Sequence, residues 1–178
     1  TKTTGTLLAV MKLYDEGKFG LTDPISKYVP AMKGSRKGKI TIEDLLYHQS
    51  GLPGSWPFYR EAINDSSYTG GFFKGRIDAN HHLRVDRRLY VVDDFKYKEE
   101  YLSGARSEAY PLQVSENLFV SPDFPKRMLE MIASDEIPLR DRRYRYSCLN
   151  FVLLKEMVEN ISGMPMDEYL EKEFYAPM

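Results

Sequence analysis

Residues 146–163 read YSCLNFVLLKEMVENISG, and this stretch predicts one well-defined helix. Its apolar residues recur at helical spacing, so they share one face, and the helix is expected to run from about Leu149 to Ile161. Gly163 follows as the stop, because glycine readily takes the left-handed conformation that closes many helices. Just before the helix stands Cys148, the only cysteine of the chain.

The same reasoning predicts further helices on both sides of this stretch. Each is indicated by apolar periodicity together with a cap or a breaker. They are Thr3–Glu16 with Gly17 as its stop; a helix capped by Thr41 and Asp44 and ended by Gly51 and Pro53; a helix capped by Ser121 with Pro122 at its first position; and a last helix that starts at Pro165.

Residues 56–120 differ from the rest of the chain. They are rich in Tyr, Gly, Asp and Arg, and their periodicity is poor. A structureless stretch of that length is unusual in a compact domain, so we expect an irregular insertion with some strand content. No internal repeat is apparent. The predicted fold class is therefore mainly α, with some β in the insertion.

Composition excludes several classes of function. The chain has 178 residues, 42% of them hydrophobic, which is enough for the core of one domain. Its net charge of −1 argues against a nucleic-acid partner. No apolar run approaches the ~18 residues of a membrane span. One cysteine cannot form an internal disulfide, and the pair His81–His82 lacks further ligands at zinc-like spacing, so a solvated loop is expected there.

Three stretches, in order, carry a resemblance. They read TKTTGTLLAVMKLYDEGKFGLTDPISKYVP (1–30), ITIEDLLYHQSGLPG (40–54) and YSCLNFVLLKEMVENISGMPMDEYLEKEFYAPM (146–178). Together they resemble the serine β-lactamase and penicillin-binding-protein superfamily, in its class C, esterase and D-aminopeptidase branch. The resemblance implies that residues 1–178 are the helical portion of a partial β-lactamase/transpeptidase-like α/β domain, without its nucleophile segment and its C-terminal sheet.

The resemblance also assigns two catalytic residues. Thr1 and Lys2 match the last two places of the family's Ser-x-x-Lys motif, which makes Lys2 the general base; its serine would lie two places before Thr1. For the isolated chain, a disordered terminal lysine is the simpler interpretation of Lys2. Tyr146 matches the tyrosine of Tyr-x-Asn and would shuttle protons. With an ordinary tyrosine pKa of ~10, that role requires a nearby positive charge such as Lys2.

Cys148 occupies the asparagine place of Tyr-x-Asn. A thiol is a weak donor and acceptor, so Cys148 is interpreted as a substitution at a substrate-binding position and not as a nucleophile. Asn150 could partly compensate as a substrate-binding residue, or it could cap or brace the helix that starts there. His48 and Ser50 match the family too and are interpreted as a structural turn.

The implied reaction is acyl transfer through a serine acyl-enzyme, with no metal or organic cofactor. The implied substrates are esters, D-amino-acid peptides of the peptidoglycan and β-lactams, in that order because of Cys148. The alternative is a catalytically degenerate envelope binding module. Some members of the superfamily are fused to a family-3 glycoside hydrolase, so the resemblance allows such a fusion here too. Either reading implies a periplasmic or extracellular location. The chain alone is expected to be inactive and to need the rest of the parent domain.

Overall fold

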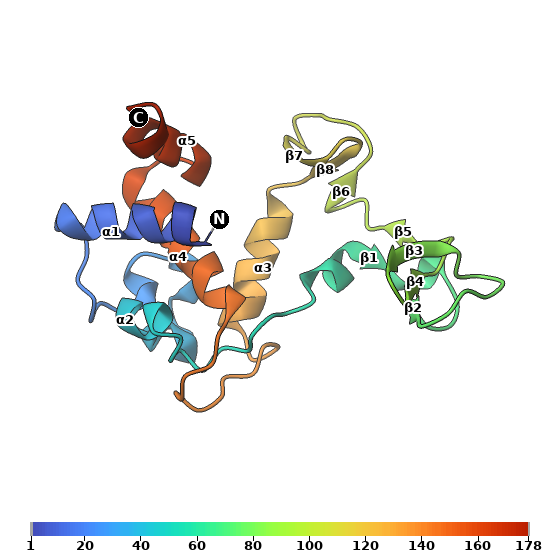
Figure 1. Cartoon of the computed structure of the whole chain (residues 1–178), viewed down its shortest axis with the longest axis horizontal. Helices are drawn as coiled ribbons and strands as arrows, with labels where there is room; N and C mark the ends of the chain where they lie inside the picture. The colour runs from blue at the N-terminus through green and yellow to red at the C-terminus, as the bar shows by residue number, and fades with distance from the viewer. Residues whose placement is uncertain (1, 178) are drawn as a thin grey trace. The chain divides into compact units, whose positions relative to one another are not determined.

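The computed structural model describes residues 2–177, which form two compact units (Figure 1). Unit 1 consists of residues 2–56 and 127–177, and unit 2 of residues 57–126. The boundary at the end of unit 2 falls inside helix α3 (Asp123–Ala133). Thr1, which the motif comparison includes, lies outside the described residues.

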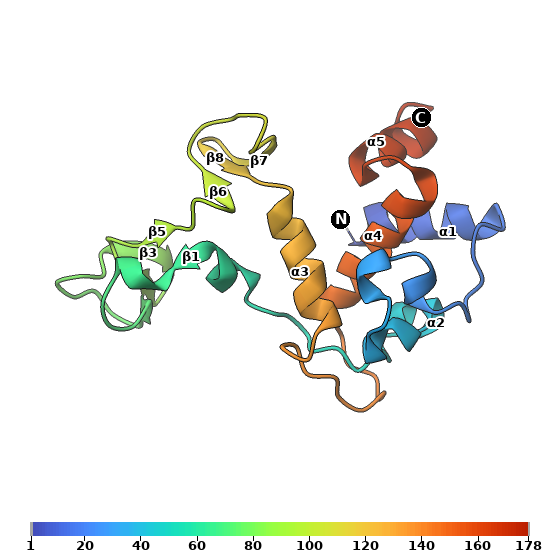
Figure 2. The same cartoon turned by 180° about the vertical axis from the view of Figure 1, so that it is seen from behind.

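Unit 1 is built from helices packed around α4 (Figures 1 and 2). In this unit α4 contacts α1, α2, α5 and the π-helical segment η1 that precedes α1. The bounds are η1 Lys2–Leu7, α1 Leu8–Asp15, α2 Ile42–Leu46, α4 Cys148–Ser162, α5 Met166–Leu170 and the π-helical η7 Glu171–Tyr175, with short 3₁₀ helices at Ile25–Lys27, Pro30–Met32 and Arg36–Lys39.

Helix α4 confirms the prediction made from its sequence, to within one residue at each end. The Ser147 hydroxyl accepts a hydrogen bond from the backbone N–H of Leu149, so Ser147 is the N-cap. Gly163 closes the helix at φ 71°, in the left-handed region. Between these ends, side chains such as Leu153 and Met157 are fully buried, so α4 supplies the centre of the unit 1 core.

The caps of the other predicted helices in unit 1 are also present. Thr41 and Asp44 form a reciprocal capping box at the start of α2. Gly17 takes φ 69° directly after the C-cap of α1. The predicted helix Thr3–Glu16 is helical throughout residues 2–15, but its first turns are wound as a π-helix, which is rare and frequently occurs at functional sites.

A buried lysine joins the two stretches of unit 1. Lys37 is 1% exposed, and its ammonium donates to the carbonyls of Ile132, Ser134 and Ile137. These carbonyls lie at and just beyond the end of α3, where a helix leaves acceptors without partners. The cation therefore satisfies acceptors at the negative end of the helix. Burial lowers the pKa of Lys37.

Unit 2 contains short antiparallel strands. The strands are β1 Ile63–Asn64, β2 Phe73–Lys74, β3 Leu83–Asp86, β4 Leu89–Val91, β5 Lys96–Tyr97, β6 Leu102–Ser103, β7 Leu112–Ser115 and β8 Leu118–Val120. Two sheets have three strands each, in the orders β2-β4-β3 and β6-β8-β7, while β1 pairs with β5. A 3₁₀ helix at Phe58–Ala62 precedes β1, and another covers Asp65–Ser67.

The two three-stranded sheets have the same register, shifted by 29 positions. Phe73 pairs with Val91 as Leu102 pairs with Val120, and both hairpins carry an irregularity two residues before their turn. Residues 63–91 (repeat 1) and 92–120 (repeat 2) therefore form a tandem repeat, and the expectation of no internal repeat was wrong. Few positions are identical: Asp65/Asp94, Tyr68/Tyr97, Gly75/Gly104, Leu83/Leu112, Val85/Val114, Leu89/Leu118 and Val91/Val120.

Side chains at equivalent positions also have equivalent tasks. Arg84 and Gln113 each donate to the carbonyl of the last residue of their strand and to the carbonyl that follows it in the turn. His81 and Tyr110 each bond to a backbone carbonyl ten or eleven residues earlier. Residues of different chemistry thus stabilise the same loop in both repeats, which is why the repeat is difficult to see in the sequence.

The mixture of many helices and small sheets agrees with the predicted fold class. Within residues 57–126, the tandem repeat of residues 63–120 supplies the expected strand content. That they are an insertion relative to the superfamily stays a prediction. No helix within residues 2–177 is long and apolar enough to cross a membrane.

Candidate active site

Lys2, Tyr146 and Cys148 come together where η1 meets the start of α4. The Lys2 Nζ atom lies 5.6 Å from the centroid of the Tyr146 ring. The hydrogen bond to Tyr146, followed by the hydrogen bond to Cys148 and its charge, raises the pKa of Lys2. Lys2 therefore lies next to the two residues with which the motif comparison associates it.

This geometry determines the charge of Lys2. Since its pKa is raised above an ordinary value near 10.5, the side chain carries a proton at neutral pH. A general base must be free of that proton when it acts. In this structure Lys2 is therefore a cation facing Tyr146, which is the positive charge that a tyrosine needs if it is to act as a proton acceptor.

Tyr146 is held from its other side by aromatic rings. Its ring centroid lies 4.7 Å from that of His48, which in turn lies 6.1 Å from Tyr144 and 5.8 Å from Phe151. Such tilted and edge contacts are favourable arrangements of aromatic rings. Tyr146 nevertheless remains 49% exposed.

His48 links Tyr146 to the protein interior. Its backbone has φ 56°, and its Nδ1 atom accepts a hydrogen bond from the backbone N–H of Ser147 at 3.1 Å. The amide nitrogen of Asn150 lies 3.2 Å from the same Nδ1 atom. Because Nδ1 faces two donors, it is an acceptor, and a neutral ring carries its proton on Nε2. Burial, and then the charge of Lys2, lowers the pKa of His48, which agrees with a neutral ring.

Asn150 is fully buried and bonds within the protein. Its Nδ2 atom donates to the carbonyl of Leu45 at 2.8 Å, and its Oδ1 atom accepts from the hydroxyl of Ser50 at 2.7 Å. With the contact to His48, the amide fastens α4 to the end of α2 and the turn that follows. Of the two roles considered for Asn150, this geometry corresponds to bracing the helix. It leaves the amide inaccessible to a substrate.

The turn of residues 48–54 lies along residues 140–148 in a series of backbone contacts. The backbone N–H of Cys148 donates to the carbonyl of Gly54, and the hydroxyl of Ser147 donates to the carbonyl of Pro53. Gly51 has φ +78°, and a Cβ atom there would lie 2.4 Å from the carbonyl oxygen of Arg140. The HQSGLPG segment thus sets the position of the stretch that carries Tyr146 and Cys148. Sequence reasoning identified the turn but missed its contact with Tyr146.

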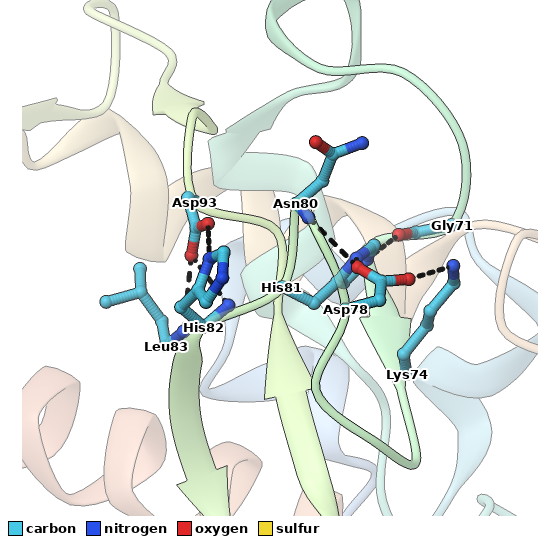
Figure 3. Close-up of polar contacts among 8 residues, drawn as sticks. All are labelled: Gly71, Lys74, Asp78, Asn80, His81, His82, Leu83 and Asp93. Carbon is cyan, nitrogen blue, oxygen red and sulfur yellow. Dashed lines mark hydrogen bonds and ion pairs between the residues drawn. The ribbon is translucent and has the colours of Figure 1, made fainter.

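The two adjacent histidines of repeat 1 have other tasks (Figure 3). His81 is 3% exposed, with Nδ1 2.8 Å from an Asp78 carboxylate oxygen and Nε2 2.8 Å from the Gly71 carbonyl oxygen. His82 bonds through Nδ1 to the Asp93 carboxylate. The expectation of a solvated loop is therefore wrong for His81, because its ring is buried and both ring nitrogens have partners within the chain. Among the residues that the structure describes, no three His, Cys, Asp or Glu side chains gather as a metal site.

Comparison with known proteins agrees with the motifs. Residues 1–178 match the Beta-lactamase family. The chain is 25% identical to an N-acetylmuramyl-L-alanine amidase of Bacillus subtilis (strain 168) and to a putative D-alanyl-D-alanine carboxypeptidase of Salmonella gallinarum (strain 287/91 / NCTC 13346). Each alignment covers 100% of this chain but only 30% of the amidase and 31% of the carboxypeptidase.

A solved structure shows the same fold. It is the octameric penicillin-binding protein homologue from Pyrococcus abyssi, with a TM-score of 0.53 and 22% sequence identity. The likeness covers 99% of this chain and 29% of that one. Because the family match extends over the whole chain, this chain belongs to the Beta-lactamase family.

Proposed function

We propose that the protein that contains this chain is a serine hydrolase that works through an acyl-enzyme, with Lys2 and Tyr146 in its active site. The observation that carries the proposal is the contact between Lys2 and Tyr146, which are far apart in the sequence and lie 5.6 Å apart, Nζ to ring centroid. Family membership supports the reaction class. The chain spans about 30% of the length of the curated relatives described above, so the activity is a property of the whole protein.

The raised pKa of Lys2 refines the roles expected from the motifs. Lys2 serves as a cation beside Tyr146, and Tyr146 takes the proton of the nucleophilic serine. Tyr146 then returns this proton to the leaving group. His48 keeps the Tyr146 ring in place by packing against it in a tilted arrangement. A serine placed one helical turn before Lys2 would lie on the same face of η1.

Among the three substrate classes, a D-amino-acid peptide of the peptidoglycan is the substrate we propose. Relatives named as putative D-alanyl-D-alanine carboxypeptidases support it, because that name refers to a peptide of D-amino acids. The relative named as an N-acetylmuramyl-L-alanine amidase supports amide cleavage in general. The site would then act in the cell envelope. Cys148 supports the same choice against β-lactams, since a thiol cannot hold a substrate amide with both a donor and an acceptor.

One observation favours a second function, binding without turnover. Cys148 stands where the motif has an asparagine, and the amide of Asn150, the nearest substitute, is buried and bonded within the protein. A protein with this site could hold a peptidoglycan peptide next to Lys2 and Tyr146 and not cleave it.

The experiment labels the natural full-length protein with a fluorophosphonate and, separately, with a penicillin, and locates the adducts by peptide mass. An adduct on a serine two residues before Thr1, lost in Tyr146→Phe and kept in the neighbouring control Tyr144→Phe, is the expected result. Hydrolysis of a D-alanyl-D-alanine peptide would then identify the substrate class. If the folded protein forms no adduct but still binds the peptide, binding without turnover is the function and hydrolysis is not.

A further inference from the structure

The apolar face of each sheet in unit 2 extends onto an uncovered outer strand. In repeat 1, Leu83 pairs with buried Val91, which also pairs with Phe73. In repeat 2, Leu112 pairs with buried Val120 in the same way. Paired residues share one face of a sheet, so each set of paired apolar residues extends across the central strand, β4 or β8, to the outer strand, β3 or β7.

The outer strands β3 and β7 expose the same apolar residues. Leu83 and Val85 are 49% and 56% exposed, and their equivalents Leu112 and Val114 are 45% and 60% exposed. These positions are identical in the two repeats although most others differ. The shared pattern Leu-x-Val thus leaves about half of each of these apolar side chains exposed on β3 and β7.

Both outer strands also leave one backbone edge open. Within residues 2–177, β3 pairs only with β4 and β7 pairs only with β8. Proteins usually protect such edges with lysine, proline or an inward charge, because an open edge can pair with another strand. On β3 the Leu and Val alternate with Arg84 and Asp86, and on β7 with Gln113 and Ser115, so the apolar side chains of each strand share one face, and the backbone edge that pairs with no described strand can accept a further one.

The two repeats carry opposite charge. Repeat 1 has five Lys or Arg and three Asp or Glu, a net charge of +2 with neutral histidines, while repeat 2 has three and six, a net charge of −3. The difference reaches the edges themselves, because Arg87 follows β3 at the position where Glu116 follows β7. The partner that complements each edge in both shape and charge is therefore the equivalent edge of the other repeat.

We propose that unit 2 mediates self-association, with β3 of one copy pairing with β7 of a second copy. A parallel pairing in register would place Leu83 beside Leu112, Val85 beside Val114 and Arg87 beside Glu116, and mixed sheets of this kind are common. The interface joins two different surfaces, so each copy offers one β3 edge and one β7 edge. Because charges contribute to it, association weakens as salt rises.

The first test measures the mass of the 178-residue chain by sedimentation over a range of protein concentrations, at low and at high salt. We expect concentration-dependent oligomers that dissociate in salt. Arg87→Glu or Glu116→Arg alone should weaken the association roughly tenfold, because each turns a cross-strand attraction into a repulsion. The double variant R87E/E116R should restore it, and this recovery depends on the parallel alignment of the two positions.

The second test combines two variants that each lose one edge. L83K/V85K lacks a functional β3 edge and L112K/V114K a functional β7 edge, so each should be monomeric, while a mixture of the two should give a 1:1 dimer and nothing larger. Ile77→Lys is the matched control, since Ile77 is 58% exposed in repeat 1 but lies outside its strands. Circular dichroism verifies the fold of each variant. If L83K/V85K does not fold, R87E replaces it, and if L112K/V114K does not fold, E116R replaces it, since each of these changes only a turn residue.

Clear outcomes overturn the proposal. A chain that stays monomeric up to about millimolar concentration at low salt does not associate through these edges. Association that survives both edge variants occurs elsewhere on the molecule. Equal loss of association in the Ile77→Lys control would show that any added charge has this effect, and that the edges have no special part in it.

Discussion

Replacing Asn150 by alanine should be among the most destabilising single changes in unit 1. The side chain is 0% exposed and makes hydrogen bonds to the carbonyl of Leu45 and the hydroxyl of Ser50. Each bond contributes about 1 kcal/mol net, and a buried carbonyl left without its donor adds roughly 1–3 kcal/mol. We therefore expect a loss of about 3 kcal/mol in the free energy of unfolding, or roughly 6–12 °C in Tm.

Asn160→Ala provides the matched control, because Asn160 lies on the same helix. Its amide is exposed and donates to the carbonyl of Tyr28 at 3.0 Å. Its removal should cost at most about 1 kcal/mol. Urea unfolding, followed by circular dichroism at neutral pH, measures both variants under the same conditions.

Asn150→Asp separates the donor from the acceptor. The change keeps the shape of the side chain, but an aspartate oxygen would face the Leu45 carbonyl and could not donate to it. At neutral pH it should destabilise the protein at least as much as alanine, since it also buries a charge. Part of the loss should return in acid, where the carboxyl group becomes a donor. The bracing argument fails if Asn150→Ala costs no more than Asn160→Ala.

Two further predictions concern a buried histidine and a glycine. Because the Gly71 carbonyl and then the Asp78 carboxylate raise the pKa of His81 above its ordinary value, His81 stabilises the fold fully below about pH 6.5 and less as pH rises through its folded pKa. We compare the unfolding free energy of the natural chain with that of His81→Gln from about pH 5.5 to about pH 8.5. The difference should shrink as pH rises, and a constant difference contradicts this argument. Gly51→Ala should destabilise the chain by about 2 kcal/mol more than Gly34→Ala in thermal unfolding. Both glycines have positive φ, but only at Gly51 would a Cβ atom meet a backbone carbonyl, at 2.4 Å. Equal losses would show that the backbone adjusts.

The helices of unit 1 could be predicted because each carries a local signal. Thr41 with Asp44, Gly17 and Gly163 mark their helix ends through interactions within a few residues. The repeat of unit 2 could not be predicted in the same way. Its strands have two to four residues, too short for a clear alternation of apolar and polar residues, and equivalent loops are tied by different side chains such as His81 and Tyr110.

The candidate site was partly accessible from the sequence. The motif positions of Lys2, Tyr146 and Cys148 predict that these residues meet, and the structure brings them together. The bond network around His48 and Asn150 requires knowledge of which turn faces which helix. That information depends on residues about 100 positions apart, which no local pattern encodes.

The buried ammonium of Lys37 has a consequence for how the chain can be divided. Unit 1 consists of two stretches separated along the chain by unit 2, and Lys37 fastens the first stretch to three carbonyls of the second. The continuous backbone through unit 2 is therefore one of several connections between them. A protease that nicks the turn between β7 and β8 would leave two pieces that still purify together, and the halves expressed separately could reassemble. Unit 1 can thus be treated as a split protein whose two parts are linked along the chain by unit 2.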